Sequence, residues 1–127
     1  MPAPASLDGR TIEEMRTLLG AARLDELLSL LTGELEQRPR MVREALADRA
    51  FERAAAEAHS LKGAAANLGA SQVAEAARLL EIAIAAAASG EARGVAPALR
   101  RLAGAVSDTQ QALASLPRPA NVLAIEA

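Results

Sequence analysis

Residues 51–69 read FERAAAEAHSLKGAAANLG, and the spacing of the apolar side chains in this stretch predicts a helix that decides the fold. At about 100° per residue, five apolar positions gather on one side of that helix. They are Ala54, Ala58, Leu61, Ala65 and Leu68. This side has to face a core, and Gly69 suits the left-handed position just past a helix end. We therefore expect a core-facing helix that closes at Gly69.

Helical spacing continues toward the N-terminus. Thr11 is typical of an N-cap with Glu14 as its capping-box partner, and Gly20 ends a short first helix. A longer helical segment then carries a leucine stripe, and we expect this helix to kink near Pro39. The stripe consists of Leu24, Leu27, Leu28, Leu31 and Leu35.

Two further helices are predicted toward the C-terminus. Ser71 can cap the first of them, and Gly90 ends it. The second runs from about Glu91 to Leu116, with Pro97 close enough to its start to be tolerated. No stretch alternates between apolar and polar residues as a half-buried strand would.

Long amphipathic helices joined by short turns pack most simply as an antiparallel bundle. The predicted fold class is therefore all-α, an antiparallel up-down-up-down four-helix bundle with a short extra N-terminal helix. We expect this bundle at residues 11–116, between an N-terminal tail at residues 1–10 and a C-terminal tail at residues 117–127.

The composition excludes several classes of function. The 127 residues carry a net charge of -2 and are only 1% aromatic, which disfavours nucleic-acid binding through phosphate attraction or base stacking. With no Cys and a single His, the chain lacks disulfides, a thiol nucleophile and the ligands of a thiolate or multi-histidine metal site. We therefore expect neither a bound metal nor a cofactor.

The sequence also favours a cytoplasmic protein that does not enter a membrane. Its start, MPAPASLDGR, lacks the basic region and apolar stretch of a secretory signal peptide. The most apolar window, LLEIAIAAAA at residues 79–88, is shorter than the roughly 18 residues needed to cross a bilayer and contains Glu81.

The face of the predicted helix that carries His59 has an unusual composition. His59 points about 140° away from the core side, close to Lys62, and Ser60 and Asn67 flank this outer face. Four small residues surround it on this outer face: Ala55, Ala56, Gly63 and Ala66. A lone exposed His is most often a solvated side chain, and a surface Lys most often serves solubility. A solvated face usually carries long polar side chains, however, so the small residues indicate a surface on which a partner docks.

The run AHSLKGAAANLGA at residues 58–70 resembles the signature of histidine-containing phosphotransfer (Hpt) domains, in which His, Leu-Lys-Gly and Leu-Gly follow at these spacings. The resemblance covers roughly residues 7–116. It extends to Leu7-Asp8, Met15-Arg16, Leu19-Gly20 and Leu79-Leu80-Glu81. The chain departs from the family pattern at Leu31, where many members have an aromatic residue, and at Ala50, where an acidic residue often stands.

The resemblance implies that His59 accepts a phosphoryl group on Nε2 from an aspartate of one receiver domain and passes it to another. Lys62 would then lie near the phosphoryl oxygens. The implied partners are response-regulator receiver domains and a hybrid sensor histidine kinase, with Mg²⁺ on the receiver domain. The chain has no GxxxxGK[ST] loop, so we expect no ATP-dependent kinase activity of its own, and we expect a monomer.

Three other interpretations stay open. A helical bundle could bind receiver domains without relaying phosphate, and a phosphorylation assay would separate that function from a relay. A dimeric histidine-kinase phosphotransfer fragment would also present a His on a bundle, but it uses two helices per chain. A lipid-surface bundle fits least, since no predicted helix combines a Lys/Arg-rich face with large apolar anchors.

Overall fold

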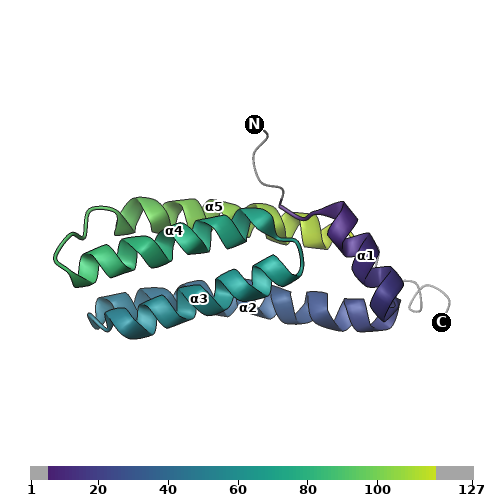
Figure 1. Ribbon diagram of the computed structural model, residues 1–127, viewed down its shortest axis with the longest axis horizontal. Coiled ribbons are helices and arrows are strands. Elements are labelled where there is room, and N and C mark those ends of the chain that lie inside the picture. The colour runs from purple at the N-terminus through teal and green to yellow at the C-terminus, as the bar shows by residue number, and fades with distance from the viewer. Residues whose placement is uncertain (1–5, 117–127) are drawn as a thin grey trace.

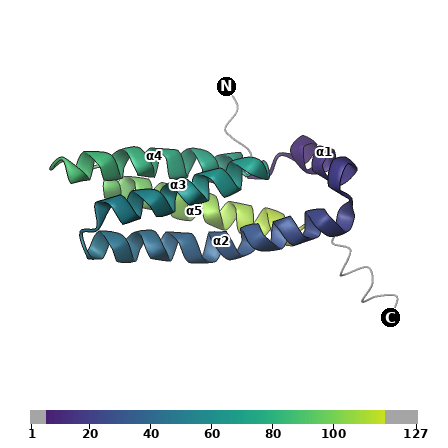
Figure 2. The ribbon, with the colours of Figure 1, turned by 60° about the horizontal axis from the view of Figure 1, so that its bottom comes forward.

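The computed structural model describes residues 6–116, which form five α-helices and contain no strand (Figure 1). In chain order these are α1 (Gly9–Leu19), α2 (Ala21–Ala47), α3 (Phe51–Asn67), α4 (Ser71–Ala88) and α5 (Val95–Ala114). The contacts α2 with α3, α3 with α4 and α4 with α5 follow the chain, and α5 closes the ring on α2. The short α1 lies at one end of this bundle (Figure 2). The predicted four-helix bundle with an extra N-terminal helix is confirmed.

The core is built from aliphatic side chains and many alanines. The predicted inward positions of α3 are all buried, and Leu31 and Leu35 of α2 expose 1% of their surface. Each buried Leu contributes about 2 kcal/mol of transfer free energy, and each Ala contributes much less. The alanines instead let helix axes approach closely. On α4 they are Ala76, Ala77 and Ala87.

Two glycines make the turns that sequence spacing predicted. Gly20 has φ 86° and Gly69 has φ 74°, both in the left-handed region that favours glycine. At Gly69 a Cβ atom would also lie 3.0 Å from the Cβ of Thr11. The Asp8 N–H donates to the Gly69 carbonyl at 2.8 Å, so the chain before α1 is tied to the α3–α4 turn.

The starts of three helices, α1, α4 and α5, differ from the predictions. Helix α1 begins at Gly9 and its N-cap is Asp8, whose carboxylate accepts from the Arg10 N–H at 3.0 Å, so the Thr11 cap was wrong. A carboxylate satisfies the free amides of a first turn better than a Thr hydroxyl, and Thr11 itself donates to Asp8. Helix α4 has Ala70 as its N-cap with no side-chain cap, so the cap assigned to Ser71 was wrong as well.

Helix α5 begins at Val95, four residues later than the Glu91 that the sequence predicted. Gly90 adopts φ 101°, and the Glu91 N–H bonds back to the carbonyl of Ala86. Residues 91–94 therefore belong to a turn, which a helical pattern alone does not reveal. Helix α2 continues through Pro39, and the kink expected there stays a prediction.

Candidate functional site

His59 lies in the middle of α3 and points to solvent. Its side chain is 63% exposed, whereas Ala58 just before it and Leu61 two residues after it are fully buried. The orientation predicted from the apolar spacing is therefore correct. The helix holds the imidazole on a rigid backbone, where a partner can reach it.

One carboxylate from the neighbouring helix joins His59 to Lys62. Glu81 of α4 lies with its Oε2 3.2 Å from His59 Nδ1 and its Oε1 3.2 Å from Lys62 Nζ. An ionised carboxylate only accepts hydrogen bonds, so Nδ1 carries the proton that it donates to Glu81. In the neutral ring the other nitrogen, Nε2, then keeps its lone pair. Because this lone pair is free, Nε2 is the ring nitrogen that can act as a nucleophile.

The pairing of α3 with α4 explains why Glu81 reaches His59. The two helices form an antiparallel hairpin, and both residues lie eleven positions from Ala70 in the turn. Residues equidistant from a tight turn come to the same level of such a hairpin. Leu80, the residue before Glu81, is fully buried, which places Glu81 at the rim of the helix interface.

The predicted docking residues occupy the open side of α3. Ala56, Ser60, Gly63, Ala66 and Asn67 are exposed, and Ala55 is half-buried against the core. At Gly63 an added Cβ would meet nothing within 4 Å. These small residues therefore leave the imidazole accessible to a partner. Whether a partner lies on these residues stays a prediction.

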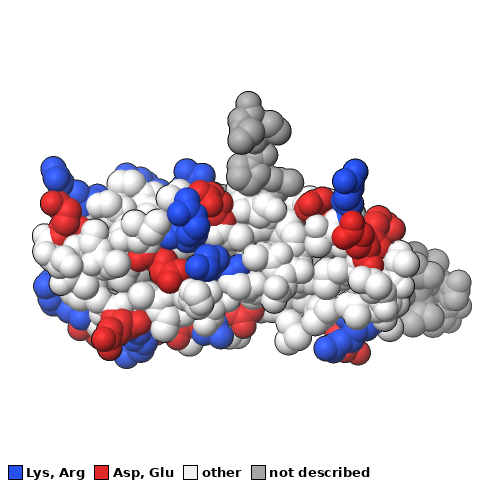
Figure 3. All heavy atoms as spheres, in the orientation of Figure 1, with Lys and Arg blue, Asp and Glu red and all other residues white. Residues whose placement is uncertain are grey.

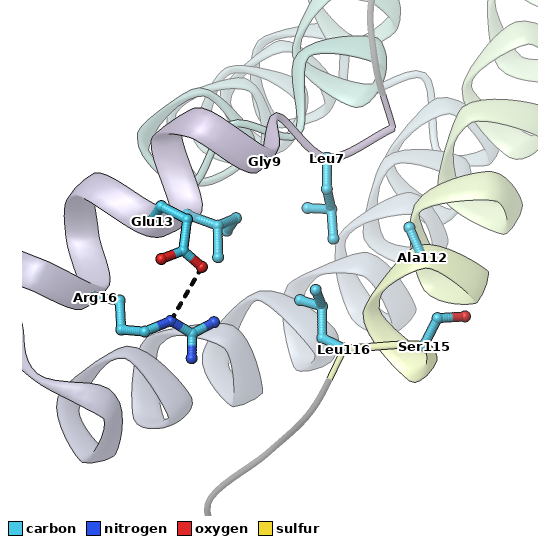
Figure 4. A pocket seen from close by; sticks show the side chains of 8 residues that line it. Leu7, Gly9, Glu13, Arg16, Ala112, Ser115 and Leu116 are labelled. Carbon is cyan, nitrogen blue, oxygen red and sulfur yellow. Dashed lines mark ion pairs between the residues drawn. The ribbon is translucent and has the colours of Figure 1, made fainter.

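A groove of about 710 Å³ lies at the end of the bundle between α1 and α5, and none of the predicted site residues lines it (Figure 4). Its walls are largely apolar, with Leu7, Ile12 and Leu116 among them. Glu13 and Arg16 of α1 pair at its edge, with 3.4 Å between Oε1 and Nε. It is formed by different elements from the His59 site.

Within residues 6–116 no group of three or more His, Asp or Glu side chains is placed to hold a metal ion. Over the same residues, every helix is too short or too polar to span a bilayer.

The model of the Hpt domain family matches residues 9–112. The chain belongs to the Hpt domain family. This Hpt domain is also similar to the crystal structure of histidine-containing phosphotransfer protein B from Pseudomonas aeruginosa PAO1, with a TM-score of 0.68 and 22% sequence identity. The similarity covers 91% of this chain and 100% of that one, and it supports the fold. Among curated proteins no match was found.

Sequence reasoning missed the role of Glu81. The resemblance included this residue only as part of the helix after the His, and the apolar window treated it as an interruption. Two signals were present: a single acid within an otherwise apolar run, and equal spacing from the predicted turn at Gly69 and Ala70. Both become informative only once α3 and α4 are paired.

Proposed function

We propose that this Hpt domain relays a phosphoryl group between receiver-domain aspartates through His59. Membership of the family makes it a phosphotransfer domain of phosphorelay signalling. The observation that carries the assignment to His59 is its exposed ring with Nδ1 held by Glu81. It is also the single His of the chain.

The Nε2 lone pair attacks the phosphorus of an aspartyl phosphate, and the bond between phosphorus and the aspartate oxygen breaks. The aspartate leaves as a carboxylate with the bonding electron pair. Because the Nδ1 proton stays in place, the phosphorylated ring carries a positive charge, which the Glu81 carboxylate stabilises across 3.2 Å. The reverse attack by a second aspartate releases the phosphoryl group and returns the neutral ring.

Lys62 brings a positive charge to the same side of α3 as the imidazole. Its ammonium lies 3.2 Å from Glu81 Oε1, which keeps it close to the ring. A phosphoryl oxygen about 4 Å from this ammonium gains roughly 1 kcal/mol in water and up to about 4 near a protein surface. We propose that Lys62 stabilises phosphohistidine in this way, in competition with Glu81.

The proposed partners are response-regulator receiver domains and a hybrid sensor histidine kinase. Phosphoryl transfer depends on positioning and charge neutralisation, so the receiver's acidic pocket and its Mg²⁺ would supply most of the catalysis. We propose that Ala55, Ala56, Ser60, Gly63, Ala66 and Asn67 form the surface on which the receiver docks, and that this Hpt domain acts as a monomer in the cytoplasm.

The test is phosphotransfer from a panel of phosphorylated receiver domains to the wild-type chain and to His59→Gln. We expect acid-labile label on the wild type and none on the variant, because Gln offers no basic nitrogen. The exposed position of His59 leaves the fold intact, which a melting curve verifies. Label on the variant would contradict the assignment, and a folded wild type that binds receivers without accepting label would favour a binding-only bundle.

A further inference from the structure

A shallow groove of about 590 Å³ starts at Lys62 and extends away from His59 across α3, α4 and α5. Its walls are Lys62, Ala66, Ser71, Ala74, Glu75, Arg78 and Arg101. Three of these are cations, each from a different helix, and one is an acid. In Figure 3 basic and acidic side chains gather over α3 and α4 in the middle of the face shown, with mostly uncharged surface beside them.

Two of the three cations are already paired. Lys62 forms an ion pair with Glu81, and Arg78 donates two hydrogen bonds to Glu75, at 2.7 and 3.0 Å. These hydrogen bonds from Arg78 lower the pKa of Glu75 below its ordinary value, so this carboxylate stays ionised at neutral pH.

Arg101 forms no ion pair with any residue in the described range 6–116, and its side chain is exposed. Its charge also lowers the pKa of Glu75, although less than Arg78 does. The uncompensated positive charge of the groove therefore lies at Arg101, on α5.

The groove lies within reach of any protein that docks on His59. Ala66 in its wall is seven residues from His59 on the same helix, which corresponds to about 10 Å at 1.5 Å per residue. A typical interface covers about 800 Å² on each partner, so its radius is roughly 16 Å. A receiver domain centred over the imidazole would therefore reach the Ala66 wall of the groove.

We infer that this groove is a docking subsite for an acidic side chain of the receiver domain, an Asp or Glu on the face that meets His59. The inference rests on the proposed function. Arg101 supplies the counter-charge, because Lys62 and Arg78 already have carboxylate partners. Receivers with an acid at that position bind more tightly than receivers with a neutral or basic residue there. The groove thus selects among receivers that share the same phosphorylation chemistry.

The experiment compares Arg101→Glu with Arg100→Glu. Both arginines are exposed neighbours on α5, and only Arg101 lines the groove, so the two variants change the net charge equally. Binding of unphosphorylated receiver domains to each folded variant is measured by calorimetry at low and high salt. We expect Arg101→Glu to weaken binding by about threefold to tenfold at low salt and Arg100→Glu by less than about twofold. The difference should shrink at high salt, where screening is strong.

A charge swap completes the test. Replacing the receiver's acid by Lys should weaken binding to the wild type and restore binding to Arg101→Glu. Equal effects of the two arginine variants, no effect of either, or no binding by any receiver in the panel would overturn the inference. Because binding is measured without transfer, the outcome is separate from that of the proposed function: discriminating binding with no label on His59 would retain the subsite and reject the relay.

Discussion

Two grooves of the described residues 6–116 are of similar size but differ in what lines them. The groove of about 590 Å³ beside Lys62 collects charged side chains from three helices, next to the single His. The groove of about 710 Å³ between α1 and α5 is walled largely by apolar residues such as Leu7 and Leu116. The larger groove therefore has fewer charged side chains, and groove size alone does not identify the functional site in this fold.

The ion pairs of the two regions differ in exposure and in the helices that they join. Glu13 and Arg16 lie one turn apart on α1, and the Glu13 side chain is 71% exposed. Such a pair contributes about 0.3 to 0.5 kcal/mol to helix stability. Glu81 is 29% exposed and joins two groups of α3 from α4. An ion pair within one helix supports that helix, whereas one between helices sets the orientation of a reacting side chain.

The largest effect is expected at Gly63 in α3, beside the reactive His59. Gly63→Gln should raise stability by about 0.5 to 1 kcal/mol, because the position is exposed and Gln favours a helix more than Gly does. Transfer should nevertheless fall by about a hundredfold, since a long side chain one turn from His59 displaces the receiver's reacting aspartate. Melting temperature and single-turnover rate are measured on the same preparation.

Gly104→Gln is the matched control for this prediction. Gly104 lies in α5, is exposed, has no heavy atom within 4 Å of an added Cβ, and belongs neither to the predicted docking surface nor to the wall of the groove beside Lys62. The Gly104→Gln variant should gain similar stability and transfer the phosphoryl group at the wild-type rate. Full-rate transfer by Gly63→Gln would remove the argument from steric access.

Glu81 provides the second and intermediate effect. Glu81→Ala removes the acceptor of the Nδ1 proton and should slow transfer by about fivefold to tenfold, which corresponds to roughly 1 kcal/mol of barrier. Glu81→Gln keeps an acceptor oxygen without its charge and should lie between Ala and the wild type. Glu26→Gln, which breaks the exposed pair with Arg23 within α2, is the control and should leave the rate at His59 within about twofold. Equal rates for all three variants and the wild type would leave Glu81 with a structural role only.

Sequence periodicity correctly predicted the features that depend on residue spacing within one helix. It failed where two residues compete to cap a helix and where two segments of the chain contact each other. The apolar positions of α3 and the glycines at 20 and 69 placed most helices and turned His59 outward. The start of α1 was wrong because Asp8 competes with Thr11 for the same free amides. The start of α5 was wrong because a backbone bond from Glu91 to Ala86 holds a turn. The contact of Glu81 with His59 depends on helix pairing, which no single helix encodes.

The smallest effect is expected in the α1–α5 groove, at Glu13. Glu13→Gln removes the ion pair with Arg16 and should lower stability by less than about 0.5 kcal/mol, since the pair is exposed and lies within one helix. The transfer rate at His59 should stay unchanged within error, because α1 supplies none of the residues predicted to surround His59. Urea unfolding and single-turnover transfer measure the two quantities. A loss of transfer without loss of stability would mean that α1 contributes to receiver docking, and the distinction between a reactive groove and a structural one would then no longer hold.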